Sequence, residues 1–137
     1  MRHETNITAR YAETDQMGII HHSVYPVWYE AARTEFIKTA GITYSQLEKD
    51  GVMLPLSEIG SRYISPVRYE DKVIIETRVT KISCAKITFG YRVILDGNVV
   101  NEGFTSHGFV SSKTFRPINI KKTLPDFYEK LKSIRED

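Results

Sequence analysis

The strict alternation of apolar and polar residues in the second half of the chain constrains the fold most. In the segment 85–95 every second residue from Ala85 to Leu95 is apolar, and the segment 72–82 alternates in the same way. The Asp-Gly-Asn sequence at 96–98 is typical of a tight β-hairpin turn. A period of two predicts long antiparallel strands with one face in the core.

One long helical pattern precedes these strands, from about Ser23 to Ala40, and Gly41 is expected to end it. Pro26 falls in the first turn, where its missing N–H is tolerated. The spacing of three and four predicts one buried stripe. That stripe comprises Val24, Val27, Trp28, Ala31, Ala32, Phe36 and Ala40.

Further elements are expected on both sides of this helix. They are a short helix over 43–51, strands over 3–12, 53–65 and 99–112, and an amphipathic helix over 123–136. A strand, a long helix and then clustered strands with tight turns predict an α+β fold with an antiparallel sheet, against which the helix packs. No repeat or linker divides the sequence, so we predict a single domain over residues 1–137.

Composition narrows the classes of partner. The chain has 19 basic and 17 acidic residues, a net charge of +2, which gives no reason to expect nucleic acid or a membrane as the main partner. The single cysteine, Cys84, excludes an internal disulfide, fits a reducing compartment and is expected to be a small, semi-buried residue. With no signal-like or membrane-spanning apolar run, the expected localisation is cytoplasmic.

Ionisable side chains gather just before the long helix, in the segment ETDQMGIIHHSVYPVWYEAARTEF at 13–36. Asp15, His21 and His22 could serve metal binding, proton transfer or packing. We predict no metal site, because there is no His-x-x-x-His, His-Glu-x-x-His or cysteine pair, and adjacent histidines are expected to point in different directions. Nucleophile-elbow and phosphate-loop motifs are also absent from the sequence.

Asp15 lies seven residues before His22, where the helix is expected to begin. Backbone N–H groups at a helix start can polarise a carbonyl oxygen, and a carboxylate opposite can attack the carbonyl or deprotonate a water. This arrangement suits acyl transfer, in particular thioester hydrolysis. The structural alternative is that Asp15 is a turn residue and His22 a neighbour of the helix cap, and on spacing alone this alternative is favoured. Glu30 and Arg33 are expected to pair on the helix surface.

The same segment resembles the signature of the 4-hydroxybenzoyl-CoA thioesterase-like acyl-CoA thioesterases, Y-x-[ED]-T-D-x-x-G-x-x-x-H-x-x-Y-x-x-[WF]-x-E-x-A-R. It is met by Tyr11, Glu13, Thr14, Asp15, Gly18, His22, Tyr25, Trp28, Glu30, Ala32 and Arg33. A later stretch is similar to the family's strand entry through Tyr63, Pro66, Asp71 and Val73. The resemblance covers residues 8–116.

The resemblance implies a hot-dog fold, an antiparallel five- to six-stranded sheet wrapped around one long central helix. It implies that Asp15 acts as nucleophile or general base and that the helix N-terminus at His22 polarises the thioester oxygen. The substrate would be an acyl-CoA, with no cofactor beyond the CoA that belongs to it. Members form homodimers with active sites at the interface, so we expect a homodimer that assembles further into a homotetramer.

Four residues are expected to bind the acyl group: Gly18, by allowing a close approach of the loop, and Met17, Ile19 and Tyr25, as lining residues. His21 stands where many relatives have Tyr, and it is a candidate to border the acyl pocket. The sequence leaves open the acyl group and whether CoA or acyl-carrier protein carries it. Two alternatives to hydrolysis remain, a non-catalytic acyl-thioester binding module and a hot-dog hydratase or dehydratase.

Overall fold

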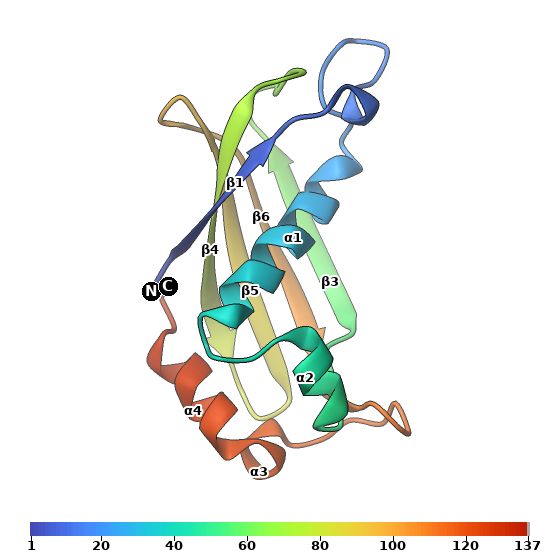
Figure 1. Cartoon of the computed structure of the whole chain (residues 1–137), viewed down its shortest axis with the longest axis vertical. Coiled ribbons are helices and arrows are strands. Elements are labelled where there is room, and N and C mark those ends of the chain that lie inside the picture. Colours follow the sequence, from blue (N-terminus) through green and yellow to red (C-terminus); the bar gives the residue numbers. More distant parts are fainter. Residues whose placement is uncertain (137) are drawn as a thin grey trace.

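The structure, a computed structural model, describes residues 1–136 of the chain. A five-stranded antiparallel sheet of order β1-β4-β5-β6-β3 carries helix α1 (Val24–Lys38) across one face (Figure 1). Its strands are β1 (His3–Thr8), β3 (Leu56–Tyr63), β4 (Lys72–Ile82), β5 (Lys86–Leu95) and β6 (Asn98–Gly108). The remaining elements are a 3-10 turn (Tyr11–Glu13), α2 (Tyr44–Lys49), β2 (Val52–Met53), β7 (Val110–Ser111), α3 (Ile120–Thr123) and α4 (Pro125–Ser133).

The central strands confirm the alternation read from the sequence. β4 occupies the predicted segment, and its buried side chains are those at 73, 75, 77 and 79. The β5–β6 hairpin turns at Asp96 and Gly97, with φ of +50° and +79°. A two-residue turn with both central φ values positive matches the right-handed twist of its strands, which is why Asp-Gly is favoured there.

Three strand predictions need correction at their ends. The strand expected over 53–65 is two elements in different sheets, because β2 pairs with β7 while β3 pairs with β6. The break falls at Pro55, which has no N–H to donate to a ladder. The strand expected over 99–112 likewise divides into β6 and β7, and the strand expected over 3–12 ends at Thr8.

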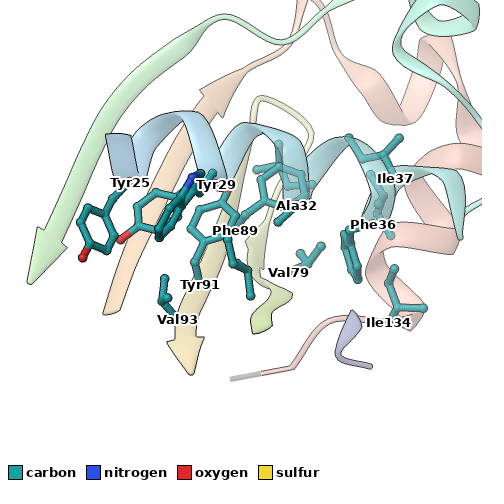
Figure 2. Packing of buried hydrophobic residues seen from close by; sticks show 14 of the residues in the cluster. Tyr25, Tyr29, Ala32, Phe36, Ile37, Val79, Phe89, Tyr91, Val93 and Ile134 are labelled. Atoms are coloured by element: carbon teal, nitrogen blue, oxygen red, sulfur yellow. The ribbon is translucent and has the colours of Figure 1, made fainter. Parts of the chain in front are cut away.

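Helix α1 buries Trp28, Ala32 and Phe36 of the predicted stripe, but other members of that stripe differ. Val27 is 59% exposed and Ala31 is also exposed, whereas Tyr25 and Tyr29 are buried. Tyr29 fits against the sheet because Gly103 lacks the side chain that would meet its ring. Its ring stacks on Tyr91 with centroids 4.4 Å apart (Figure 2).

The far half of α1 anchors the helix through apolar packing. Ala32, Phe36 and Ile37 have no exposed surface, and Figure 2 shows the first two facing the sheet residues Phe89 and Val79. Burying a side chain the size of Phe or Ile stabilises the fold by about 1.5–3 kcal/mol.

The C-terminal helix expected over 123–136 is α4, which begins at Pro125 and ends at Ser133, and a further short helix, α3, precedes it. The break between the two helices is at Leu124, because Pro125 begins α4 and disfavours a helical conformation in the residue before it. Both helices cover one end of the sheet (Figure 1). The α+β class with a five-stranded antiparallel sheet is therefore confirmed, with three shorter helices besides α1. Cys84 is exposed, not semi-buried.

Candidate functional site

The loop between the 3-10 turn and α1 closes on itself as a tight hairpin. Thr14 and Ile20 form an isolated bridge, and the Asp15 N–H donates to the Ile19 carbonyl oxygen at 2.8 Å. Gly18, with φ of +78°, turns the chain, and its N–H donates to the Asp15 carbonyl oxygen at 3.0 Å. The left-handed conformation favours glycine at this position. The structure thus gives Gly18 a role in shaping the loop that carries Asp15.

The Asp15 carboxylate is held by the backbone of its own loop. Its Oδ1 accepts hydrogen bonds from the N–H groups of Met17, at 2.8 Å, and Ile19, at 3.4 Å. Among residues 1–136 no group donates to Oδ2, and the residue is only partly buried. Asp15 is therefore a turn residue, as the structural alternative predicts, and its Oδ2 has no hydrogen-bond donor among residues 1–136.

Glu13 has a different function although it lies only two residues away. It is 7% exposed; its Oε2 accepts from Trp28 Nε1 at 3.0 Å and its Oε1 from the Arg10 N–H at 2.8 Å. Its carbonyl oxygen accepts from the His21 N–H at 2.9 Å. A buried indole N–H needs an acceptor, and Glu13 supplies it, so this carboxylate fastens the loop to α1.

The two histidines ahead of α1 also differ in their hydrogen bonds. His21 Nδ1 accepts from the Ser23 N–H at 3.1 Å, and the His21 carbonyl oxygen accepts from the Val24 N–H at 3.0 Å. His21 therefore accepts from the N–H groups of Ser23 and Val24 at the helix start, and its place beside the acyl group stays a prediction. The ring centroids of His21 and His22 are 4.1 Å apart, so these side chains lie together and do not diverge as expected.

His22 leaves its main-chain donor unused. From residue 21 to residue 24, only the His22 N–H makes no hydrogen bond within the part of the chain that the structure describes. Its carbonyl oxygen accepts from the Tyr63 hydroxyl at 3.0 Å, and its side chain is exposed. An unpaired N–H at the start of a 15-residue helix is a donor for an incoming oxygen or anion.

A cavity of about 380 Å³ adjoins this loop and the helix start. Its lining residues are Met17, Ile19, Tyr25, Tyr63, Ile64, Ser65 and Pro66. Three of the four predicted substrate-binding residues thus line one cavity. Asp15 and His22 are not in its wall but bond to residues that are, Asp15 to the Met17 and Ile19 backbone and His22 to Tyr63.

The other half of the cavity wall comes from β3 and the segment after it. The predicted site residues did not include Tyr63, Ile64, Ser65 and Pro66, which follow Tyr25 by about 40 positions. The matching tyrosine and proline of the strand-entry motif were the available signal. The Tyr25 and Tyr63 rings meet edge to face at 5.2 Å, and burial together with Tyr63 raises the pKa of Tyr25 to about 12.

A second polar cluster lies deeper, between α1 and the sheet. Arg33 does not pair with Glu30 as expected but donates to the hydroxyl groups of Tyr44, Tyr91 and Thr105, at 2.8, 3.1 and 3.4 Å. His107 Nδ1 faces the Leu54 carbonyl oxygen at 3.1 Å, so this nitrogen carries the proton and Nε2 accepts from Thr105 at 2.9 Å. Burial and the nearby charge of Arg33 lower the pKa of His107 to about 4. The cluster holds neutral His107 inside the core.

The described residues contain neither a cluster of metal ligands nor a helix that could span a membrane. Across residues 1–136 no group of three or more His, Cys, Asp or Glu side chains is placed to hold a metal ion. Over the same residues, every helix is too short or too polar to cross a bilayer.

The known proteins that this chain resembles include thioesterases. Residues 9–132 match the family described as the thioesterase-like superfamily. YneP of Bacillus subtilis, provisionally named an acyl-CoA thioesterase, is 38% identical over 130 residues, which cover 92% of this chain and 94% of that protein. The acyl-CoA thioester hydrolase YbgC of Escherichia coli is 27% identical over 93 residues, 67% of this chain and 69% of its own.

Solved structures agree with the sequence relatives. The DHNA-CoA thioesterase from Staphylococcus aureus superposes with a TM-score of 0.93 at 33% identity, covering 97% of this chain and 90% of that one. The predicted hot-dog fold is confirmed by this likeness.

Proposed function

Because the chain belongs to the thioesterase-like superfamily, we propose that it is an acyl-CoA thioesterase that hydrolyses the thioester of an acyl-CoA to the free acid and CoA. The prediction of a thioester hydrolase is confirmed at this coarser level by the relatives named above. One observation carries the finer assignment. Asp15 holds a carboxylate oxygen open on the loop that also supplies Met17 and Ile19 to the cavity, ahead of the unpaired His22 N–H.

In the proposed reaction the thioester carbonyl oxygen accepts a hydrogen bond from the His22 N–H. As negative charge develops on that oxygen, the backbone donor and the positive end of the helix stabilise it. Because His21 and Glu13 hold the neighbouring backbone groups, the donor is fixed before substrate arrives.

Asp15 supplies the second half of the chemistry through Oδ2. In one route it attacks the carbonyl carbon, CoA leaves as the thiolate, and water hydrolyses the resulting acyl anhydride. In the other it removes a proton from water, whose oxygen attacks the carbonyl carbon before CoA leaves. A thiol has a pKa of about 8.5, so the thiolate leaves without a strong general acid. The acyl chain would lie against Gly18, Met17, Ile19 and Tyr25.

We also propose that two copies pair to complete this site and that the homodimers assemble into a homotetramer. Strand β3 is a sheet edge, paired only with β6 in the described chain, and it exposes Leu56, Ile59 and Tyr63. Exposed apolar side chains along an open strand edge are typical of an interface between chains. Tyr63 lies both on this edge and in the cavity wall, so pairing there brings a second copy close to the substrate.

The decisive experiment measures thiol release from acyl-CoAs of graded length and ring content. Asp15→Asn keeps an oxygen that can accept from the Met17 N–H, so the loop should fold, while thiol release should fall by roughly 10²–10⁴-fold. Asp126→Asn, at an exposed residue of α4, is the matched control and should be as fast as wild type. Unchanged thiol release by Asp15→Asn would rule out Asp15 as the reacting group.

The same assay separates the alternative functions and carriers. Acyl-CoA binding without thiol release on any substrate would favour a binding module, and water addition to an enoyl-CoA would favour a hydratase. Acyl-carrier-protein thioesters, run in parallel, identify the carrier. Single turnover in ¹⁸O-labelled water distinguishes the two routes, because only direct attack places label in the Asp15 carboxylate.

A further inference from the structure

The face of the sheet opposite α1 contains a second cavity, of about 390 Å³. Four residues lie side by side across its strands, Arg78 on β4, Gly90 on β5, Phe104 on β6 and Gly60 on β3. Two of these four positions have no side chain. The Phe104 ring lies over Gly60, and the Arg78 side chain lies beside Gly90. The glycines therefore leave a hollow with an aromatic ring and a guanidinium group in its base.

The neighbouring row of residues adds charge to this hollow. Arg92 pairs in register with Glu102, which pairs in register with Arg62, and all three line the cavity together with Arg78. Three guanidinium groups and one carboxylate thus line the cavity, and Glu76, the register partner of Arg92 on β4, continues the row outside it. Within residues 1–136, Arg62 and Arg78 make no ion pair within 4.0 Å, and Arg92 approaches only Glu76, at 3.7 Å. Glu76 is itself shared with Arg2, at 3.0 Å.

Arg78 shows that this positive charge is incompletely compensated. Its Nε is buried, and no group of the described chain accepts a hydrogen bond from it. Burial and the positive charges of Arg92 and Arg2 lower the pKa of Arg78. An oxyanion in the hollow would accept the unused hydrogen bond and relieve the repulsion between the guanidinium groups.

We infer that this outer-face hollow, lined by Arg62, Arg78, Arg92, Glu102 and Phe104, binds a phosphate group of a small phosphorylated ligand. Guanidinium groups match phosphate oxygens with paired N–H donors, and Phe104 offers an apolar surface for the part of the ligand beyond the phosphate. The site lies on the face opposite the thioester cavity, because Ser61 and Tyr63 point toward α1 while Gly60 and Arg62 alternate to the other side. Two kinds of ligand have such a phosphate group: CoA, through its nucleotide, and a separate phosphorylated metabolite.

The test is direct binding, measured by NMR and calorimetry on the intact protein, so its result does not depend on thiol release. Inorganic phosphate should shift the backbone resonances of Gly60, Gly90 and Phe104, with an affinity that weakens as salt is added. Arg78→Gln should weaken phosphate binding by roughly ten-fold or more. Arg62→Gln, at an exposed position, provides a second variant that leaves the buried part of the sheet intact. Lys130→Gln on α4 removes a positive charge elsewhere and should leave the affinity unchanged.

Three further ligands separate the two sources. If 3′,5′-adenosine bisphosphate and CoA shift the same resonances and dephospho-CoA binds more weakly, the site holds the phosphate of the substrate's nucleotide. If inorganic phosphate binds there and CoA does not compete, the ligand is a separate phosphorylated metabolite. The inference is overturned if millimolar phosphate leaves these resonances unmoved. It is also overturned if both arginine variants change the assembly state while phosphate affinity stays the same.

Discussion

At the residue scale, the two carboxylates that precede α1 differ in how many of their oxygens are occupied. Both oxygens of Glu13 accept hydrogen bonds, from Trp28 and Arg10, whereas Asp15 keeps Oδ2 open. A buried acceptor with two partners is a structural group, because removing it leaves an indole N–H unsatisfied. A carboxylate with one oxygen that accepts no hydrogen bond keeps that oxygen for a reactant. The two carboxylates are thus distinguished by how many of their oxygens accept hydrogen bonds, and this number identifies Asp15 as the candidate catalytic residue.

Tyr63 offers a residue-scale test of how the His22 peptide is positioned. Tyr63→Phe removes the hydroxyl that donates to the His22 carbonyl oxygen and keeps the ring against Tyr25. Losing one neutral hydrogen bond of about 1 kcal/mol should lower kcat/KM roughly five-fold. Tyr69→Phe, on an exposed loop, should leave kcat/KM unchanged. Equal kcat/KM values for wild type and Tyr63→Phe would show that this bond does not orient the donor.

His107 predicts a pH dependence of stability. Its pKa is lowered to about 4 in the folded protein, against about 6.5 for an ordinary histidine in the unfolded chain. Between these values only the unfolded chain takes up the proton, so the free energy of unfolding should fall as the pH drops from about 6.5 to about 4. Urea unfolding of wild type and His107→Gln over this range measures the difference. A wild-type pH slope that survives in His107→Gln would contradict the assignment.

At the element scale, the start of α1 and the loop before it form one hydrogen-bonded unit. Glu13 joins the loop to Trp28 on the second turn of the helix, and His21 caps the helix through Ser23. Pro26 in the first turn has no N–H to satisfy, and His21 accepts from the Ser23 and Val24 N–H groups, which the helix itself leaves unpaired. The loop that carries Asp15 therefore takes its position from α1, and α1 in turn from the core.

Glu13→Ala tests this unit. The substitution leaves the Trp28 N–H buried without an acceptor, so the free energy of unfolding should fall by about 1–3 kcal/mol. Thiol release should also fall, because the loop that carries Asp15 is no longer fastened to α1. Glu30→Ala, on the exposed side of the same helix, should change stability by less than about 0.5 kcal/mol. Equal unfolding midpoints for the two variants would show that Glu13 contributes nothing beyond a surface carboxylate.

At the scale of the whole molecule, the two faces of the sheet differ in what covers them. Helix α1 covers the inner face, while the outer face carries glycines, Phe104 and a row of charged residues. The sheet also ends at β3 in an uncovered edge with exposed apolar side chains. Pairing through β3 would bury that edge and leave the outer face free to bind an anion.

At this scale we predict the number of copies in the assembled protein. Light scattering should find a dimer or a tetramer, and Ile59→Arg, which places a charge on the β3 edge at a side chain that is 40% exposed, should shift the protein toward monomer and lower thiol release. Tyr69→Arg places the same charge at an exposed side chain outside β3 and should keep the assembly intact. A strictly monomeric wild type with full thiol release would show that the site needs no second copy.

The sequence by itself determined the elements whose signal is local. Alternation in the segment 72–82, the Asp96-Gly97 turn and most of the long helix can be predicted because each depends on near neighbours and backbone conformation. The helix itself ends at Lys38, before the expected stop at Gly41. The spaced motif from Tyr11 to Arg33 was long enough to identify the family, and with it Asp15 and His22 as site candidates. Element ends were less predictable, since Pro55 and Pro125 interrupt patterns that otherwise continue.

Only the tertiary structure decided which side chains have partners, because the partners are far apart in the chain. Glu13 meets Trp28 from 15 positions away, Tyr63 reaches His22 across 41, and Arg33 contacts Thr105 across 72. The buried stripe of α1 likewise depended on Gly103, a glycine on a distant strand that makes room for Tyr29. Periodicity reports which face of an element is apolar, whereas hydrogen-bond occupancy depends on the packing of whole elements against one another.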